Sequence, residues 1–167
     1  MVNIRSALEG LSSVDHRATT LLRREHESIR AAFRTYHATS PLAHEALERI
    51  AHEIAWLIEL EDGVDRNVVY PALEPYFPPL IRALTVEHDE LVEQLGTVRA
   101  CARRPAELAA AVARLEALVH HHLAQEGSAL LAVVEQDEPG LNRWLYDAVV
   151  REKERLVSRA FTRERQG

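Results

Sequence analysis

Four long segments of this chain place apolar residues three or four positions apart, and His, Glu or Asp interrupts each apolar stripe. In the first and third segments the stripes consist of Leu22, His26, Ile29 and Phe33, and of Leu84, His88, Leu91 and Leu95. This spacing is typical of one face of an α-helix, and no segment alternates polar and apolar residues as a half-buried strand does. Amphipathic helices must bury their apolar faces against one another, so the sequence predicts an all-α fold.

Prolines and turn residues divide the helical pattern. The expected helices span about residues 15–37, 41–70, 80–102 and 105–135, and a fifth follows Pro139-Gly140 at about 141–161. The second helix is expected to stop at Pro71, and the PALEPYFPP stretch is expected to be a connector. Four long helices with short links predict an antiparallel up-down-up-down bundle with an additional C-terminal helix. The expected organisation is an N-terminal extension (1–14), the bundle (15–137) and an amphipathic helix packed on the bundle (138–167).

Length, charge and cysteine content limit the kind of protein that this chain is expected to be. A chain of 167 residues is long enough for one domain with its own core. The net charge of −6 disfavours a nucleic-acid or anionic-membrane partner. One cysteine forms no internal disulfide, and no stretch approaches the length of a membrane span, so we expect a cytoplasmic protein without a membrane partner. The charged run at 151–166, REKERLVSRAFTRERQ, reads as a solvated helix end.

The three consecutive histidines of the fourth helix differ in register. Continuing the stripe of Leu115, Leu118 and Val119 leads to His122 and Glu126, which lie four positions apart and share one face. The same stripe is expected to continue through Ala129, Leu130 and Val133. His121 shares its face with Arg114 and Gln125 and is expected to be exposed, whereas His120 lies at the boundary. The triplet therefore contains one inward histidine, paired with an inward carboxylate.

The second helix repeats this arrangement with Glu61 and Asp65, before Val68 resumes its apolar stripe. A buried carboxylate or imidazole is costly unless it is paired or coordinates a metal. One inward histidine alone is usually a hydrogen-bonded core residue, but such interruptions in all four helices favour a shared metal site. The candidate ligands are His26, Glu61, Asp65, His88, His122 and Glu126. The remaining histidines outside the triplet lack this register and are expected at the surface: His16, His37, His44 and His52.

The segments REHESI, LIELEDGVDRNVVYPAL, VEHDEL and HHLAQEGSALL together resemble the four motifs of hemerythrin-like HHE cation-binding domains, over about residues 20–135. This resemblance implies a four-helix bundle that holds a non-heme di-iron centre. The family's histidines of the first and third helices fall on His26 and His88, and its fourth-helix pair falls on His122 and Glu126. The best single marker is the aromatic-proline pair Tyr70-Pro71.

The second helix departs from the family pattern. Counting back from Tyr70-Pro71, the expected His-x-x-x-Glu falls on Glu61 and Asp65, so a carboxylate replaces the histidine and the acid is one carbon shorter. The third helix also lacks the second histidine that the oxygen carriers use one turn from His88. These changes argue against reversible oxygen carriage.

Three functions fit this ligand set. The first is a di-iron protein that reacts with or senses O2, peroxide or nitric oxide, with an oxidase or catalase-like activity as the enzyme alternative. The second is a protein that binds iron or another metal without turnover, and the third is a structural bundle that has lost its metal. Imidazole and carboxylate ligands suit two iron ions, with manganese or zinc as alternatives. The expected partner is a small diatomic or peroxide ligand, and the chain is expected to be a monomer or a homodimer.

Overall fold

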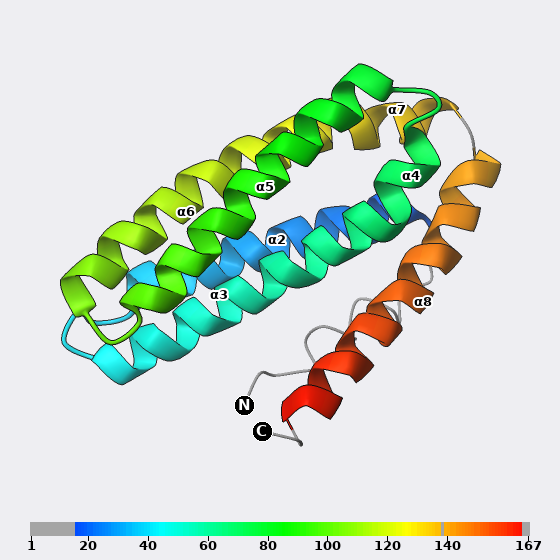
Figure 1. Cartoon of the computed structure of the whole chain (residues 1–167). Coiled ribbons are helices and arrows are strands. Elements are labelled where there is room, and N and C mark those ends of the chain that lie inside the picture. The colour runs from blue at the N-terminus through cyan, green and yellow to red at the C-terminus, as the bar shows by residue number, and fades with distance from the viewer. Residues whose placement is uncertain (1–15, 138, 165–167) are drawn as a thin grey trace.

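A computed structural model describes residues 16–137 and 139–164, and every regular element in these ranges is a helix. Four long helices lie side by side and run alternately in opposite directions: α2 (Ala18–Ala38), α3 (His44–Val64), α5 (Pro78–Cys101) and α6 (Pro105–Gln125) (Figure 1). The predicted all-α bundle is therefore confirmed. The predicted N-terminal extension lies outside the described residues.

Two of the four helices continue through a short π-helix. The π-helix η2 (Asp65–Val69) joins α3 to α4 (Tyr70–Leu73), and η3 (Glu126–Leu130) joins α6 to α7 (Leu131–Asp137). In a π-helix each N–H bonds five residues back, which accommodates one extra residue in the turn. Such single-turn insertions in α-helices are frequent at functional sites.

The prediction that the second helix stops at Pro71 is wrong, because helix continues to Leu73. Proline breaks an α-helix mainly by removing an i→i−4 hydrogen bond and by steric conflict with that carbonyl. Here Pro71 is the second residue of α4, just past the end of η2, and the N–H of Tyr70 already bonds to the Asp65 carbonyl, five residues back. The regular series of i→i−4 backbone hydrogen bonds is already interrupted at this point, so Pro71 costs the helix little. The rest of the proline-rich stretch does connect α4 to α5.

The π-helices also correct the predicted apolar stripes downstream of the candidate ligands. The sequence pattern placed Val68 and Val133 on the buried face, but both are only half-buried. Their neighbours Val69 and Val134 are buried instead, at 0% and 2% exposure. One extra residue per π-turn rotates all later positions, so the face that meets the core moves by one residue.

The apolar core has two large clusters with the candidate ligands between them, and a small third cluster of Leu60 and Val157 lies under α8. One cluster lies towards the α2–α3 and α5–α6 turns and includes Phe33, Ile58 and Leu91. The other lies towards α4, α7 and α8 and includes Leu22 and Leu84. Each ligand-bearing stripe passes from one cluster to the other, so the polar residues form a layer across the bundle.

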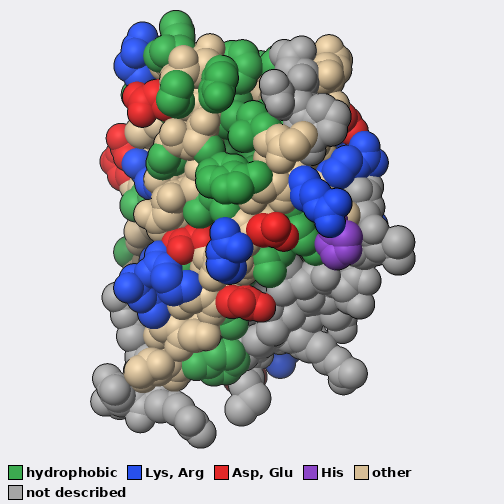
Figure 2. All heavy atoms as spheres, turned by 90° about the vertical axis from the view of Figure 1, so that its right-hand side faces the viewer, with side chains coloured by type: hydrophobic (Ala, Val, Ile, Leu, Met, Phe, Trp, Pro, Cys, Tyr) green, Lys and Arg blue, Asp and Glu red, His purple; other side chains and the backbone are tan. Residues whose placement is uncertain are grey.

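The fifth predicted helix is confirmed as α8 (Pro139–Glu164), which contacts α2 and α3 outside the four-helix core (Figure 1). Leu145, Tyr146 and Val149 on α8 are buried in the second cluster. Figure 2 shows the end of the molecule nearest α7 and the start of α8, where hydrophobic side chains mix with charges of both signs. Among the described residues, no helix is long and apolar enough to cross a membrane.

Two helical glycines differ in the space available for a side chain. A Cβ on Gly96, within α5, would meet nothing within 4 Å, whereas a Cβ on Gly63 would lie 2.8 Å from Cδ1 of Leu156 on α8. We expect Gly96→Ala to raise the free energy of unfolding by about 0.5–1 kcal/mol, because alanine restricts the unfolded chain. Gly63→Ala should give a smaller gain, since Leu156 must move. Urea denaturation of both variants measures the difference, and equal gains would mean that α8 does not pack on α3 at Gly63.

Candidate metal centre

All six candidate ligands are buried and project into the layer between the two core clusters. His26 comes from α2 and His88 from α5, while Glu61 lies in the last turn of α3 and His122 in the last turn of α6. The exposed fractions are 3% for His26 and Glu61 and 0% for Asp65, His88, His122 and Glu126. The structure therefore brings together every residue that the sequence singled out as an inward-facing ligand.

The ligand atoms lie close enough to share metal ions. Two groups have donor atoms within 4.8 Å of one another: Asp65, His88 and His122, and Glu61, Asp65, His122 and Glu126. The groups overlap at Asp65 and His122. His26 belongs to neither group, but its Nε2 lies 3.0 Å from Oε2 of Glu126 and 3.4 Å from Oε1 of Glu61. The six side chains form one contiguous cluster.

The cluster leaves many buried polar atoms without a hydrogen bond in the structure. These atoms are Nε2 of His26, His88 and His122, Nδ1 of His88, and both carboxylate oxygens of Glu61, Asp65 and Glu126. The short contacts of His26 have ion-pair distances but lack hydrogen-bond geometry. Unsatisfied buried polar groups cost free energy, and a metal ion coordinated by imidazole nitrogen and carboxylate oxygen satisfies them. The residues present therefore fit a metal cation.

Outer carboxylates lie against two of the imidazoles. Nδ1 of His122 is hydrogen-bonded to Oε2 of Glu87 at 2.9 Å, whereas Nδ1 of His88 lies 3.0 Å from Oδ1 of Asp62, an ion-pair distance without hydrogen-bond geometry. The Arg66 guanidinium holds Asp62 in turn, through a 2.6 Å bond from Nε to Oδ1. When Nδ1 donates its proton to a carboxylate, Nε2 is free to bind a metal, which is the usual outer-shell arrangement of metal-binding histidines. Sequence reasoning missed Asp62 and Glu87.

Burial disfavours the ionised forms of two of the carboxylates. Burial, with the charges of Asp65 and Glu126 adding to it, raises the pKa of Glu61 to about 8. Burial and the charge of Glu126 likewise raise the pKa of Asp65 to about 7. Carboxylates crowded together without a cation hold protons, and binding a metal ion displaces those protons.

The pKa values of His26 and Glu126 shift in opposite directions, because each group stabilises the charged form of the other. Burial lowers the pKa of His26, but the neighbouring carboxylates of Glu126 and Glu61 outweigh it and raise that pKa to about 9. For Glu126, burial raises the pKa, but His26 and His122 outweigh it and leave the pKa below its ordinary value. The cluster therefore pairs imidazolium with carboxylate when no metal neutralises it.

A tyrosine borders the centre and was not among the predicted site residues. Tyr70 is 3% exposed, its hydroxyl has no hydrogen-bond partner in the structure, and its ring lies 5.4 Å from that of His88. Burial and the charges of Asp65, Glu126 and Glu61 raise its pKa far above the usual value, so Tyr70 stays protonated. A protonated phenol beside several carboxylates is a hydrogen-bond donor for the centre. The sequence marked Tyr70 only as half of an aromatic-proline pair.

The histidines assigned to the surface lie there. His121 is 64% exposed by its side chain, and His120 is also exposed. The four histidines outside the triplet that lacked the inward register are exposed as well: His16, His37, His44 and His52. Among the nine histidines, burial therefore separates the three candidate ligands from the other six.

A family comparison agrees with this geometry. The model of the hemerythrin HHE cation-binding domain matches residues 17–134. This chain belongs to that family, and its buried His/Asp/Glu cluster is placed where a metal cation can bind. The chain matches no curated protein and no solved structure. The matched range runs from α2 into the first half of α7 and excludes α8.

Proposed function

We propose that this protein is a non-heme di-iron protein that reacts with or senses O2, peroxide or nitric oxide and does not carry O2 reversibly. The observation that carries this proposal is the buried carboxylate of Glu61 at the position where the resemblance leads us to expect an imidazole. Three of the six candidate ligands are carboxylates: Glu61, Asp65 and Glu126. Hard oxygen ligands and imidazoles together suit iron.

The overlap of the two ligand groups supports a dinuclear site. Asp65 and His122 belong to both groups. A carboxylate has two oxygens, so Asp65 would be able to offer one to each ion. His122 would be able to offer only Nε2, because its Nδ1 is hydrogen-bonded to Glu87. Asp65 is therefore our candidate for the residue that the two ions share. The other five ligands would complete the two coordination spheres.

The ligand charges set the expected redox behaviour. A bound iron pair supplies the electrons with which such a protein reduces O2 or peroxide. Anionic ligands stabilise the more highly charged ferric ion by Coulomb attraction, and the low-dielectric interior strengthens this effect. Glu61 adds one such charge relative to a histidine. Glu87 and Asp62 add further negative charge behind His122 and His88. A centre of this kind is easily oxidised and slow to return to the ferrous state.

An anaerobic reconstitution tests the proposal. Ferrous iron is added without oxygen, metal content is measured, air is admitted, and the protein is then flushed with argon while its visible spectrum is followed. We expect two irons per chain and ferric bands that persist after flushing. Added peroxide should then be disproportionated to O2 and water, or should bind and change those bands.

Two results would contradict the proposal in different ways. A spectrum that returns to the ferrous baseline under argon would identify a reversible carrier. A chain that binds no metal under any of these conditions would instead be a structural bundle.

A further inference from the structure

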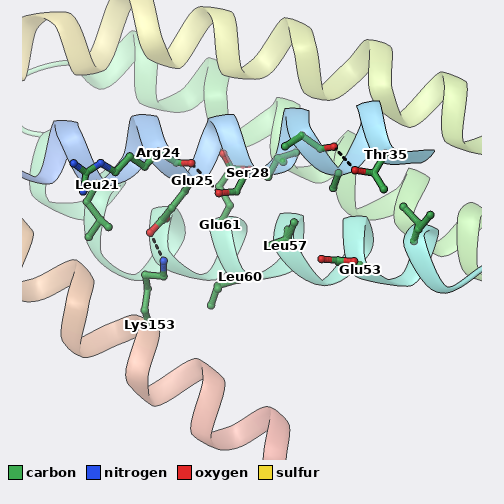
Figure 3. Close-up of a pocket in the computed structure, with 14 residues that line it drawn as sticks. Leu21, Arg24, Glu25, Ser28, Thr35, Glu53, Leu57, Leu60, Glu61 and Lys153 are labelled. Atoms are coloured by element: carbon green, nitrogen blue, oxygen red, sulfur yellow. Dashed lines mark hydrogen bonds and ion pairs between the residues drawn. The ribbon is translucent and has the colours of Figure 1, made fainter. Parts of the chain in front are cut away.

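A pocket of about 320 Å³ lies between α2 and α3 and reaches the metal centre at one residue. Glu61 lines this pocket and also belongs to the ligand cluster. Figure 3 shows Glu61 extending from α3 towards α2, with Leu57 and Leu60 on the same helix. The other candidate ligands do not line this pocket. Glu61 is thus the point at which the centre meets a space large enough for small molecules.

The chain's only lysine stands in the wall of this pocket. The sequence contains one lysine, Lys153, among 20 basic residues, and its exposed fraction is 2%. The expectation that the 151–166 run is a solvated helix end is wrong at this residue, because α8 turns it onto the bundle. Lysine is rarely buried unless it is paired. Lys153 pairs with Glu25 of α2, the residue before His26 (Figure 3).

The Lys153 ammonium keeps hydrogen-bonding capacity for a ligand. Its one hydrogen bond to a described residue goes to Glu25, while an ammonium group has three donors. Since the side chain is buried and lines the pocket, a molecule in the pocket can accept the remaining donors. Lys153 comes from α8, which lies outside the matched family domain. The added helix therefore supplies a second cationic group to a pocket that Arg24 of α2 also lines.

The geometry points to this pocket as the entrance by which small ligands reach the metal centre, with Lys153 as the donor that favours anions in it. This inference rests on the proposed function, because it needs a metal beyond Glu61. Leu57, Leu60 and Ile29 provide an apolar lining that neutral molecules cross without a partner. Three carboxylates (Glu25, Glu53 and Glu61) and two cations (Arg24 and Lys153) line the pocket, so an anion is favoured there through the hydrogen bonds that the Lys153 ammonium donates to it.

A matched pair of tryptophan variants tests the route. Ser28 lines this pocket, and Thr97 lines a separate groove between α5 and α6. Both are exposed helical residues whose hydroxyls donate to the carbonyl four residues back. With azide as the probe on the ferric protein, Ser28→Trp should slow both association and dissociation by roughly tenfold. Thr97→Trp should match the wild type, and equal rates in the two variants would overturn the route.

A second variant tests Lys153 without leaving Glu25 unpaired. In Lys153→Met/Glu25→Gln, azide association should fall by about tenfold, because the ammonium that donates hydrogen bonds to the anion is gone while the net charge of the pocket is unchanged. Nitric oxide, which is neutral, should associate with the ferrous form at the wild-type rate, and Glu25→Gln alone should retain the preference for azide. An equal fall for both probes would show a structural effect and overturn the role of Lys153.

Metal content and amine labelling separate this inference from the proposed function. A wild-type protein without metal would overturn both, whereas full metal content with equal azide rates would overturn only the entrance. The pocket is also testable without metal, since Lys153 carries the only side-chain amine. Reductive methylation followed by mass spectrometry should modify Lys153 more slowly in Ser28→Trp than in Thr97→Trp. Identical labelling would show that the pocket does not lead to Lys153.

Discussion

The His122→Ala variant should retain less than roughly a tenth of the wild-type metal content, because it removes a donor that both ligand groups share. Nε2 of His122 is buried without a protein partner, and Nδ1 is held by Glu87 at 2.9 Å. Alanine leaves a cavity at this position and leaves Glu87 without its main partner. Metal analysis of protein reconstituted with excess iron and then desalted measures the loss.

His121→Ala is the matched control for this experiment. The two histidines are adjacent, and both contact Glu87, but the His121 side chain is 64% exposed and belongs to neither ligand group. His121→Ala should bind as much metal as the wild type. Circular dichroism of both variants checks that the bundle is intact. Equal metal content in the two variants would refute the assignment of His122.

Glu61→His should make oxidation by air partly reversible. The substitution removes one negative charge from the centre and introduces the imidazole that the family resemblance leads us to expect. The ferric state loses more stabilisation than the ferrous state, because the Coulomb energy scales with the charge of the ion. Under argon, the ferric bands of this variant should therefore fade in part, whereas those of the wild type should persist. The same spectrum, recorded over repeated cycles of air and argon, measures the effect.

Asp65→Glu controls for the shape of the site. It also introduces the residue of the family pattern in the second helix, but it changes the length of a side chain and leaves the charge unaltered. If charge sets the chemistry, Asp65→Glu should stay as irreversible as the wild type. Partial reversibility in Asp65→Glu, or none in Glu61→His, would show that the negative charge of Glu61 does not determine the reaction.

The sequence predicted the straight parts of the bundle and the inward phase of the ligands. The stripes of α2 and α5 follow a constant helical period, so His26 and His88 could be placed on the buried face without a structure. The same holds for the two pairs four apart, which begin on α3 and α6 and end at the first residues of η2 and η3. Periodicity alone suffices wherever the helix keeps its 3.6-residue turn.

The sequence did not reveal where an α-helix changes to a π-helix. It also did not reveal which charged residues, expected in solvent, contact the centre or become buried. Val68 and Val133 were misplaced because no local residue signals a π-helix. Asp62 and Glu87 are charged neighbours of ligands and look solvated until α3, α5 and α6 are packed together. Lys153 sits in a run typical of a solvated helix, and only the crossing of α8 over α2 and α3 buries it.

The two π-helices also show that the bundle consists of two similar halves. α3 and α6 each have 21 residues, and each leads into a five-residue π-helix that begins with an acid. Glu61 follows His26 by 35 positions, and His122 follows His88 by 34. The ligand positions thus repeat approximately from one half to the other, although the residues around them are not similar between the halves. The ligand four positions before that acid differs between the halves: it is Glu61 in one and His122 in the other. The fold offers two nearly equivalent half-sites, and this difference between Glu61 and His122 makes their ligand sets chemically unlike.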